Sequence, residues 1–94
     1  MEICNYYIKS GKGLIKKYDS SGRIEFEGEY INGKKNGKGK EYYKKGKIKF
    51  EGDYLNGKRN GYGKQYYEIG GFEYEGEYLN GEKNGKGKEY YEIV

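Results

Sequence analysis

The sequence predicts an all-β protein: an elongated, single-layer antiparallel sheet of tandem β-hairpins with open edges. Three observations support this prediction. A unit of 24 residues occurs three times in succession. Within each unit, apolar and charged residues alternate with the period of two that is typical of a half-buried strand. Each unit also contains Asn-Gly pairs, which favour tight hairpin turns because both residues tolerate positive φ.

The repeats set the domain organisation. The three copies run from Glu27 to Tyr43, from Glu51 to Tyr67 and from Glu75 to Tyr91. We assign residues 22–94 to three tandem repeats. Residues 1–21 are predicted to form a degenerate N-terminal capping hairpin, because terminal repeats often depart from the consensus. The 94 residues then make one continuous domain.

Each repeat is predicted to contain two strands. In the first copy, Ile24–Tyr30 alternates apolar residues and glycine with glutamates, and Lys38–Tyr43 forms the second strand. The segment 32–37 between them holds two Asn-Gly pairs, and residues 44–47 turn the chain into the next copy. We therefore expect a hairpin in each repeat, joined to the next repeat by another tight turn.

The strand register follows from centring the first loop between residues 33 and 34. Gly28 then lies opposite Gly39, and Tyr30 lies opposite Gly37. A register shifted by two residues would keep every side chain on the same face, so the partners stay open. The same centring of the first loop places Ile24 opposite Tyr43. Centring the second turn between residues 45 and 46 places Tyr43 opposite Ile48.

The two faces of this sheet are predicted to differ. One face carries aromatic rows separated by a row of glycines, and we call it the aromatic trough. The other face carries alternating carboxylates and amines, such as Glu27 and Lys40, which favour one register. The aromatic residues are Phe26, Tyr30, Phe50, Tyr54, Tyr74 and Tyr78, and the structural glycines are Gly28, Gly39, Gly52, Gly63, Gly76 and Gly87.

The composition argues against several classes of protein. Histidine is absent, which removes the commonest general base and the commonest transition-metal ligand. We therefore expect no enzyme activity, no cofactor, no metal site and no small-molecule substrate. The single cysteine, the lack of a long apolar run and the lack of a signal-peptide core predict a cytoplasmic location.

Charge is distributed unevenly along the chain. The net charge is +4 overall, with +7 in residues 1–49 and −3 in residues 50–94. One interpretation is drift among solvated side chains. The other is head-to-tail or antiparallel self-association, in which the basic part of one copy meets the acidic part of another.

The repeated pattern resembles a known family. The order Tyr/Phe-Glu-Gly-Glu-Tyr-Leu-Asn-Gly-Lys-x-Asn-Gly-x-Gly is similar to the MORN (membrane occupation and recognition nexus) repeat, and the resemblance extends from Gly22 to Tyr91. It implies protein-interaction scaffolds, dimerisation modules or accessory regions beside enzymes, and binding to acidic phospholipids has been proposed for the family. The unit of 24 residues is one residue longer than the usual MORN repeat, and this length is nearer that of the variant common in bacterial and viral proteins. Tyr30, Tyr54 and Tyr78 stand where the family often has tryptophan.

Two surfaces are candidate binding sites. The aromatic trough either forms the core of its own sheet or receives a helix, a peptide or a second copy, because a single layer has nothing of its own to cover the rings. The turn edge is the second candidate, and it either protects the sheet edge and aids solubility or contacts acidic lipid. Its predicted cations are Lys34, Lys35, Lys58, Arg59 and Lys83.

The leading functional hypothesis is a non-enzymatic protein-interaction or scaffold module that self-associates. A peripheral binder of acidic membrane is the alternative, and weak binding is expected from the many glutamates. A third hypothesis is a microbial or viral immunity or counter-defence factor that binds a larger protein, suggested by the short chain and the repeat spacing. Nucleic acid binding is disfavoured, because the carboxylate rows would repel phosphate and no recognisable binding module occurs.

Overall fold

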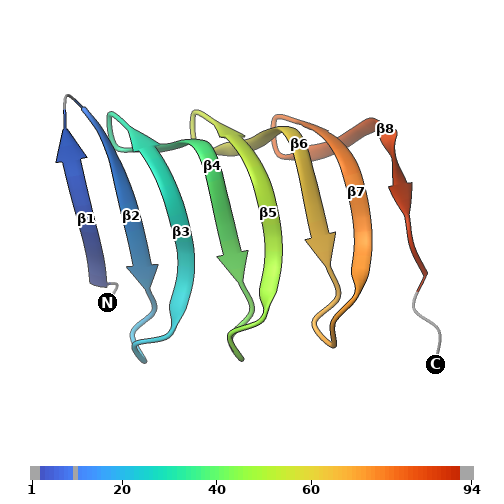
Figure 1. Ribbon diagram of the computed structural model, residues 1–94, viewed down its shortest axis with the longest axis horizontal. Coiled ribbons are helices and arrows are strands. Elements are labelled where there is room, and N and C mark those ends of the chain that lie inside the picture. Colours follow the sequence, from blue (N-terminus) through green and yellow to red (C-terminus); the bar gives the residue numbers. More distant parts are fainter. Residues whose placement is uncertain (1–2, 10, 92–94) are drawn as a thin grey trace.

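The protein is one open sheet of eight antiparallel strands. The computed structural model describes residues 3–9 and 11–91, with side chains from residue 11 onward. The strands follow their order in the chain, and each is hydrogen-bonded to its sequence neighbours, so that β1 and β8 lie at opposite ends (Figure 1). The molecule measures 43 × 29 × 16 Å, which confirms the elongated single layer. The strands are β1 (Ile3–Lys9), β2 (Lys12–Tyr18), β3 (Ile24–Ile31), β4 (Lys34–Tyr42), β5 (Ile48–Leu55), β6 (Lys58–Tyr66), β7 (Phe72–Leu79) and β8 (Glu82–Glu89).

Helices are absent from the described residues. Over the same part of the chain, nothing helical is long and apolar enough to cross a bilayer. The N-terminal hairpin β1–β2 pairs with the first full repeat through β2 and β3. That this N-terminal hairpin caps the stack of repeats stays a prediction.

The first Asn-Gly pair of each repeat forms the predicted hairpin turn. Ile31 pairs with Lys34, so the loop holds only Asn32 and Gly33, with φ of 49° and 82°. Positive φ at both central residues defines a type I′ turn, whose twist matches that of the strands. The turns also connect repeats, because the Gly57 N–H donates to the Lys35 carbonyl at 2.8 Å.

The second Asn-Gly pair does not form a turn. Gly28 lies opposite Gly39 as predicted, but Tyr30 lies opposite Lys35 and not Gly37. The two extra residues bulge out of β4, where Gly37 has a φ of 104° and the Lys38 N–H donates to Glu29 Oε2 at 2.7 Å. The sheet therefore uses both predicted registers, one on each side of a bulge.

A second bulge lies near the other turn of each repeat. Tyr42 pairs with Ile48, so the predicted pairing of Tyr43 with Ile48 is wrong. Ile24 pairs with Tyr18 of β2, and the pairing of β3 with β4 ends at Phe26 and Glu41, so the predicted pairing of Ile24 with Tyr43 is not formed. A shift of one residue moves side chains to the opposite face. Ile24, Ile48 and Phe72 therefore join the face that carries the charged rows.

The core consists of aromatic rings that lie on bare backbone. Phe26 and Phe50 are 2% and 0% exposed, although the sheet has only one layer. The predicted glycine row is confirmed by the pairs that join Gly28, Gly39 and Gly52 and continue to Gly87. A methyl group on Gly39 would lie 2.6 Å from the Phe26 ring and 2.9 Å from the Tyr54 ring. Only glycine leaves room for rings at these positions.

Replacing Gly39 by alanine should therefore destabilise the sheet. We expect a loss of about 1–3 kcal/mol in the free energy of unfolding, because the new methyl group overlaps two buried rings. Urea titration followed by circular dichroism measures it. Lys40→Ala, on the adjacent residue and the opposite face, is the control and should change stability by about 0.5 kcal/mol or less. Equal losses in the two variants would contradict the ring-on-backbone packing.

Candidate functional site

The aromatic trough is a closed core. Phe26 and Tyr54 pack edge to face with centroids 5.3 Å apart, and Phe50 and Tyr78 repeat this contact at 5.1 Å. Each phenylalanine thus receives a tyrosine from the next repeat. The six predicted partner-binding rings lie together, as expected, but five of them are buried and Tyr30 is half-buried. The expectation that the single layer leaves these rings uncovered is wrong.

The cover comes from three of the predicted turn-edge cations. Lys35 Nζ lies 4.3 Å from the centroid of the Phe26 ring, and the Arg59 guanidinium lies 4.0 Å from that of Phe50. Lys83 Nζ lies 4.9 Å from the Tyr74 ring centroid. Cations above ring faces are attracted by the ring quadrupole. Lys34 and Lys58, by contrast, are exposed beside the turns, so the five cations do not form one edge.

Arg59 organises the centre of this cover. Its Nε donates to Glu41 Oε2 at 3.0 Å and its Nη2 to Glu41 Oε1 at 3.1 Å, which makes a bidentate pair. Its Nη1 donates to Gln65 Oε1 at 3.1 Å. The Tyr54 hydroxyl also donates to Glu41, and the Tyr78 hydroxyl donates to Gln65 at 3.0 Å.

Sequence reasoning missed Glu41 and Gln65. A signal was present, because each follows the structural glycine of its strand by two residues and so shares its face. Burial opposes ionisation of Glu41, but the hydrogen bonds from Arg59 and Tyr54 outweigh it and lower its pKa. Burial raises the pKa of Tyr54 well above its usual range, and Glu41 raises it further. The carboxylate is therefore held ionised beside a neutral phenol.

Removing the arginine should destabilise the core strongly. Arg59→Ala leaves the Glu41 carboxylate without its partner over the buried rings, and we expect a loss of about 2–4 kcal/mol in the free energy of unfolding. Chemical denaturation gives this value directly. The neighbouring variant Lys58→Ala removes an exposed cation and should cost about 0.5 kcal/mol or less. A similar small cost for Arg59→Ala would show that the cover contributes little.

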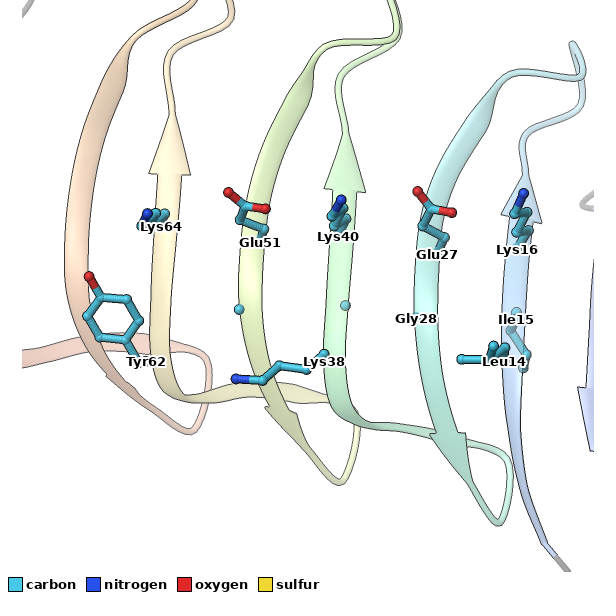
Figure 2. A pocket seen from close by; sticks show the side chains of 12 residues that line it. Leu14, Ile15, Lys16, Glu27, Gly28, Lys38, Lys40, Glu51, Tyr62 and Lys64 are labelled. Carbon is cyan, nitrogen blue, oxygen red and sulfur yellow. The ribbon is translucent and has the colours of Figure 1, made fainter. Parts of the chain in front are cut away.

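The opposite side of the sheet, which we call the charged face, carries an ordered row of charges. Figure 2 shows Lys16, Glu27, Lys40, Glu51 and Lys64 in one line, one residue from each strand from β2 to β6. The strand pairing continues the row to Glu75 on β7 and Lys88 on β8. Lysine and glutamate therefore alternate across seven strands.

Tyrosines fix the carboxylates of this row. The Tyr42 hydroxyl donates to Glu27, and the Tyr66 hydroxyl donates to Glu51. Glu75 accepts from both Tyr62 and Tyr90, each at 2.7 Å. The carboxylates are thus held in place by neutral donors and not by lysines.

A groove runs beside the charged row. Its floor is the backbone of Gly28, Gly39 and Gly52, and it encloses about 640 Å³. The row forms one wall, and Leu14, Lys38 and Tyr62 stand along the other (Figure 2). Past Tyr62 a second hollow of about 380 Å³ continues over Gly76 and Gly87. The glycines therefore leave space on this face, while rings fill their other side.

Six of the exposed apolar side chains lie on the charged face, while Ile69 and Tyr91 are exposed outside the strands. Leu14 is 65% exposed and lies two residues from Lys16, while Tyr62 is 50% exposed and lies two residues from Lys64. Strand alternation and the bulges place the others on the same side. We call this set the apolar patch residues, and they are Leu14, Leu55, Tyr62, Phe72, Leu79 and Tyr90.

High pH should weaken the sheet through its tyrosines. Burial raises the pKa of Tyr42, Tyr66 and Tyr78 to about 12, and hydrogen bonds to carboxylates add to the effect for Tyr42 and Tyr66. A raised folded-state pKa contributes stability that is present below the unfolded value and lost as the pH rises through the folded value. The free energy of unfolding should therefore fall between pH 10 and about pH 12.

The measurement is urea unfolding at a series of alkaline pH values. Tyr42→Phe removes one of the titrating groups, so its stability should depend less steeply on pH than that of the parent chain. A flat profile for the parent over this interval would contradict the hydroxyl–carboxylate bonds.

The site offers contact surface but little chemistry. Across residues 11–91, whose side chains are described, no group of three or more metal-ligating residues occurs.

A search of curated proteins found no match to the chain. A family model described as MORN repeat matches residues 26–48, 50–72 and 74–92. These matches begin at Phe26, Phe50 and Tyr74, the rings that lie on the glycine row.

Proposed function

The chain belongs to the MORN repeat family, and from this premise we propose that it is a non-enzymatic protein-interaction module that associates with itself. MORN repeats serve in general as protein- or membrane-interaction modules. We further propose that the partner is a second copy of the chain and that the contact surface is the charged face.

One observation carries the proposal: the apolar patch residues share a face that no second layer covers among the described residues. Exposed apolar side chains that gather on one face usually mark an interaction surface. Tyr62, Phe72 and Tyr90 are also of the aromatic type that is enriched at protein interfaces. The face spans most of a molecule 43 Å long and 29 Å wide, which is ample for a standard interface.

The aromatic trough has a supporting role in this proposal. Its rings are buried under Lys35, Arg59 and Lys83, so they hold the sheet in shape and have little surface to offer a partner. Binding of a partner directly to the trough remains the sequence-based prediction, and it requires that this cover move aside.

Protein binding is favoured over binding to acidic membrane. Three of the five predicted lipid-contacting cations lie over rings, and of the five only Lys34, Lys58 and Lys83 are exposed. Lys83 Nζ also lies 3.7 Å from Glu89 Oε1. Three exposed cations give weak attraction to an anionic surface, since each adds only about 1 kcal/mol.

Sedimentation equilibrium over a range of protein concentrations tests the proposal. The parent chain should associate, and Phe72→Lys should raise the dissociation constant about tenfold or more, because it places a charge in the apolar patch. Ile69→Lys is the matched control, since Ile69 is exposed in the turn just before Phe72, and it should leave association unchanged.

Two outcomes would contradict the proposal. A parent chain that is monomeric at every concentration and captures no protein in a pull-down would remove the interaction role. Co-sedimentation with vesicles of anionic lipid, but not with neutral vesicles, would favour the membrane role if protein association were absent.

A further inference from the structure

The charged row is complementary to a reversed copy of itself. It reads Lys, Glu, Lys, Glu, Lys, Glu, Lys across β2 to β8. When such a row is turned end to end about an axis between two strands, every lysine meets a glutamate. When the axis passes through a strand, every residue meets its own kind. The row therefore selects between docking registers that differ by one strand spacing, about 4.8 Å.

The side chains of the charged row are available for contacts with a second molecule. Its carboxylates are fixed by tyrosine hydroxyls, as described above. Its amines form no ion pair with a carboxylate of the described residues. They repeat at every second strand, about 10 Å apart. Side chains that are already ordered lose less entropy when a partner docks.

We propose that two copies dock through their charged faces about a two-fold axis parallel to the strands and located between β5 and β6. This inference rests on the proposed self-association and specifies its surface and register. It places Lys40 against the partner's Glu75 and Glu51 against the partner's Lys64. The same operation places β3 over the partner's β8, so Glu27 meets the partner's Lys88.

A stripe of apolar side chains across β4 to β7 fits the same register. Pairing along the strands places the half-buried Tyr42 over the partner's Phe72 and the half-buried Ile48 over the partner's Tyr66. This stripe removes apolar surface from water and supplies the driving force, because exposed ion pairs contribute little. The charged row then fixes orientation and register, as charges at interfaces commonly do.

A second row of the charged face favours this axis over the one between β4 and β5. Across β2 to β8 this row consists of Leu14, Glu29, Lys38, Asp53, Tyr62, Glu77 and Lys86. With the axis between β5 and β6, Lys38 meets the partner's Glu77 and Glu29 meets the partner's Lys86. With the axis between β4 and β5, Lys38 meets the partner's Asp53, but Leu14 faces the partner's Glu77. The first arrangement therefore forms more contacts between opposite charges.

The contact is isologous, so it closes as a dimer and does not extend into a filament. The two glycine-floored grooves face each other and form a channel that water can fill.

Charge reversal across the interface tests the register. Lys40 and Glu75 lie on β4 and β7 and are not neighbours within one chain, so a double reversal cannot restore a contact inside the monomer. We expect Lys40→Glu and Glu75→Lys each to raise the dissociation constant about tenfold or more. The double variant should return it to within about threefold of the parent value. An equimolar mixture of the two single variants should form a heterodimer of similar strength.

Lys45→Glu and Glu68→Lys provide matched reversals in exposed turns and should leave association unchanged. Sedimentation equilibrium reports the constants, and circular dichroism verifies that each variant keeps its sheet. A monomeric parent chain overturns both the self-association and this arrangement. A parent that associates while the double variant stays as weak as the singles overturns this arrangement alone.

Discussion

The structure depends on aromatic rings packed against a row of glycines in their own sheet. A single layer has no second layer to bury its apolar residues, so the space for a core must come from missing side chains. Gly39 and Gly63 leave that space, and the rings of Phe26 and Phe50 fill it. Each ring is then closed by a tyrosine from the next repeat and by a cation above it. Because the tyrosine that packs on each phenylalanine comes from the next unit, a single repeat cannot bury its own core.

This packing leaves the other side of the sheet available. The fully buried rings all lie on the aromatic side, while the charged face holds half-buried side chains such as Tyr66. The charged face also holds tyrosine-fixed carboxylates and the apolar patch residues. A repeat that forms its core from one face can vary the other face for binding. That division lets a small, polar chain combine a stable sheet with a broad exposed face.

Much of the fold follows from the repeat and its period of two, because alternation alone decides which residues share a face. The glycine row was predictable for this reason, and so was the Asn32–Gly33 turn. The bulges were not, since a shift of two residues at Gly37 preserves every face and leaves no trace in the pattern. The one-residue bulge beside Tyr42 was not predictable for a related reason, because it moves side chains to the other face only at the strand end. Lys35 and Arg59 were misplaced because both were assigned to loops, although each is the second residue of a strand and lies over a ring.

The most direct test of ring-on-backbone packing is the proton NMR spectrum of the glycines. An α-proton that lies close to the face of an aromatic ring is shifted upfield by the ring current. The account predicts strong upfield shifts for α-protons of Gly39 and Gly63, and none for Gly46 and Gly57, which lie in turns with no atom near the site of a Cβ. Ordinary shifts at all four glycines would contradict the account, because they would place the rings away from the backbone.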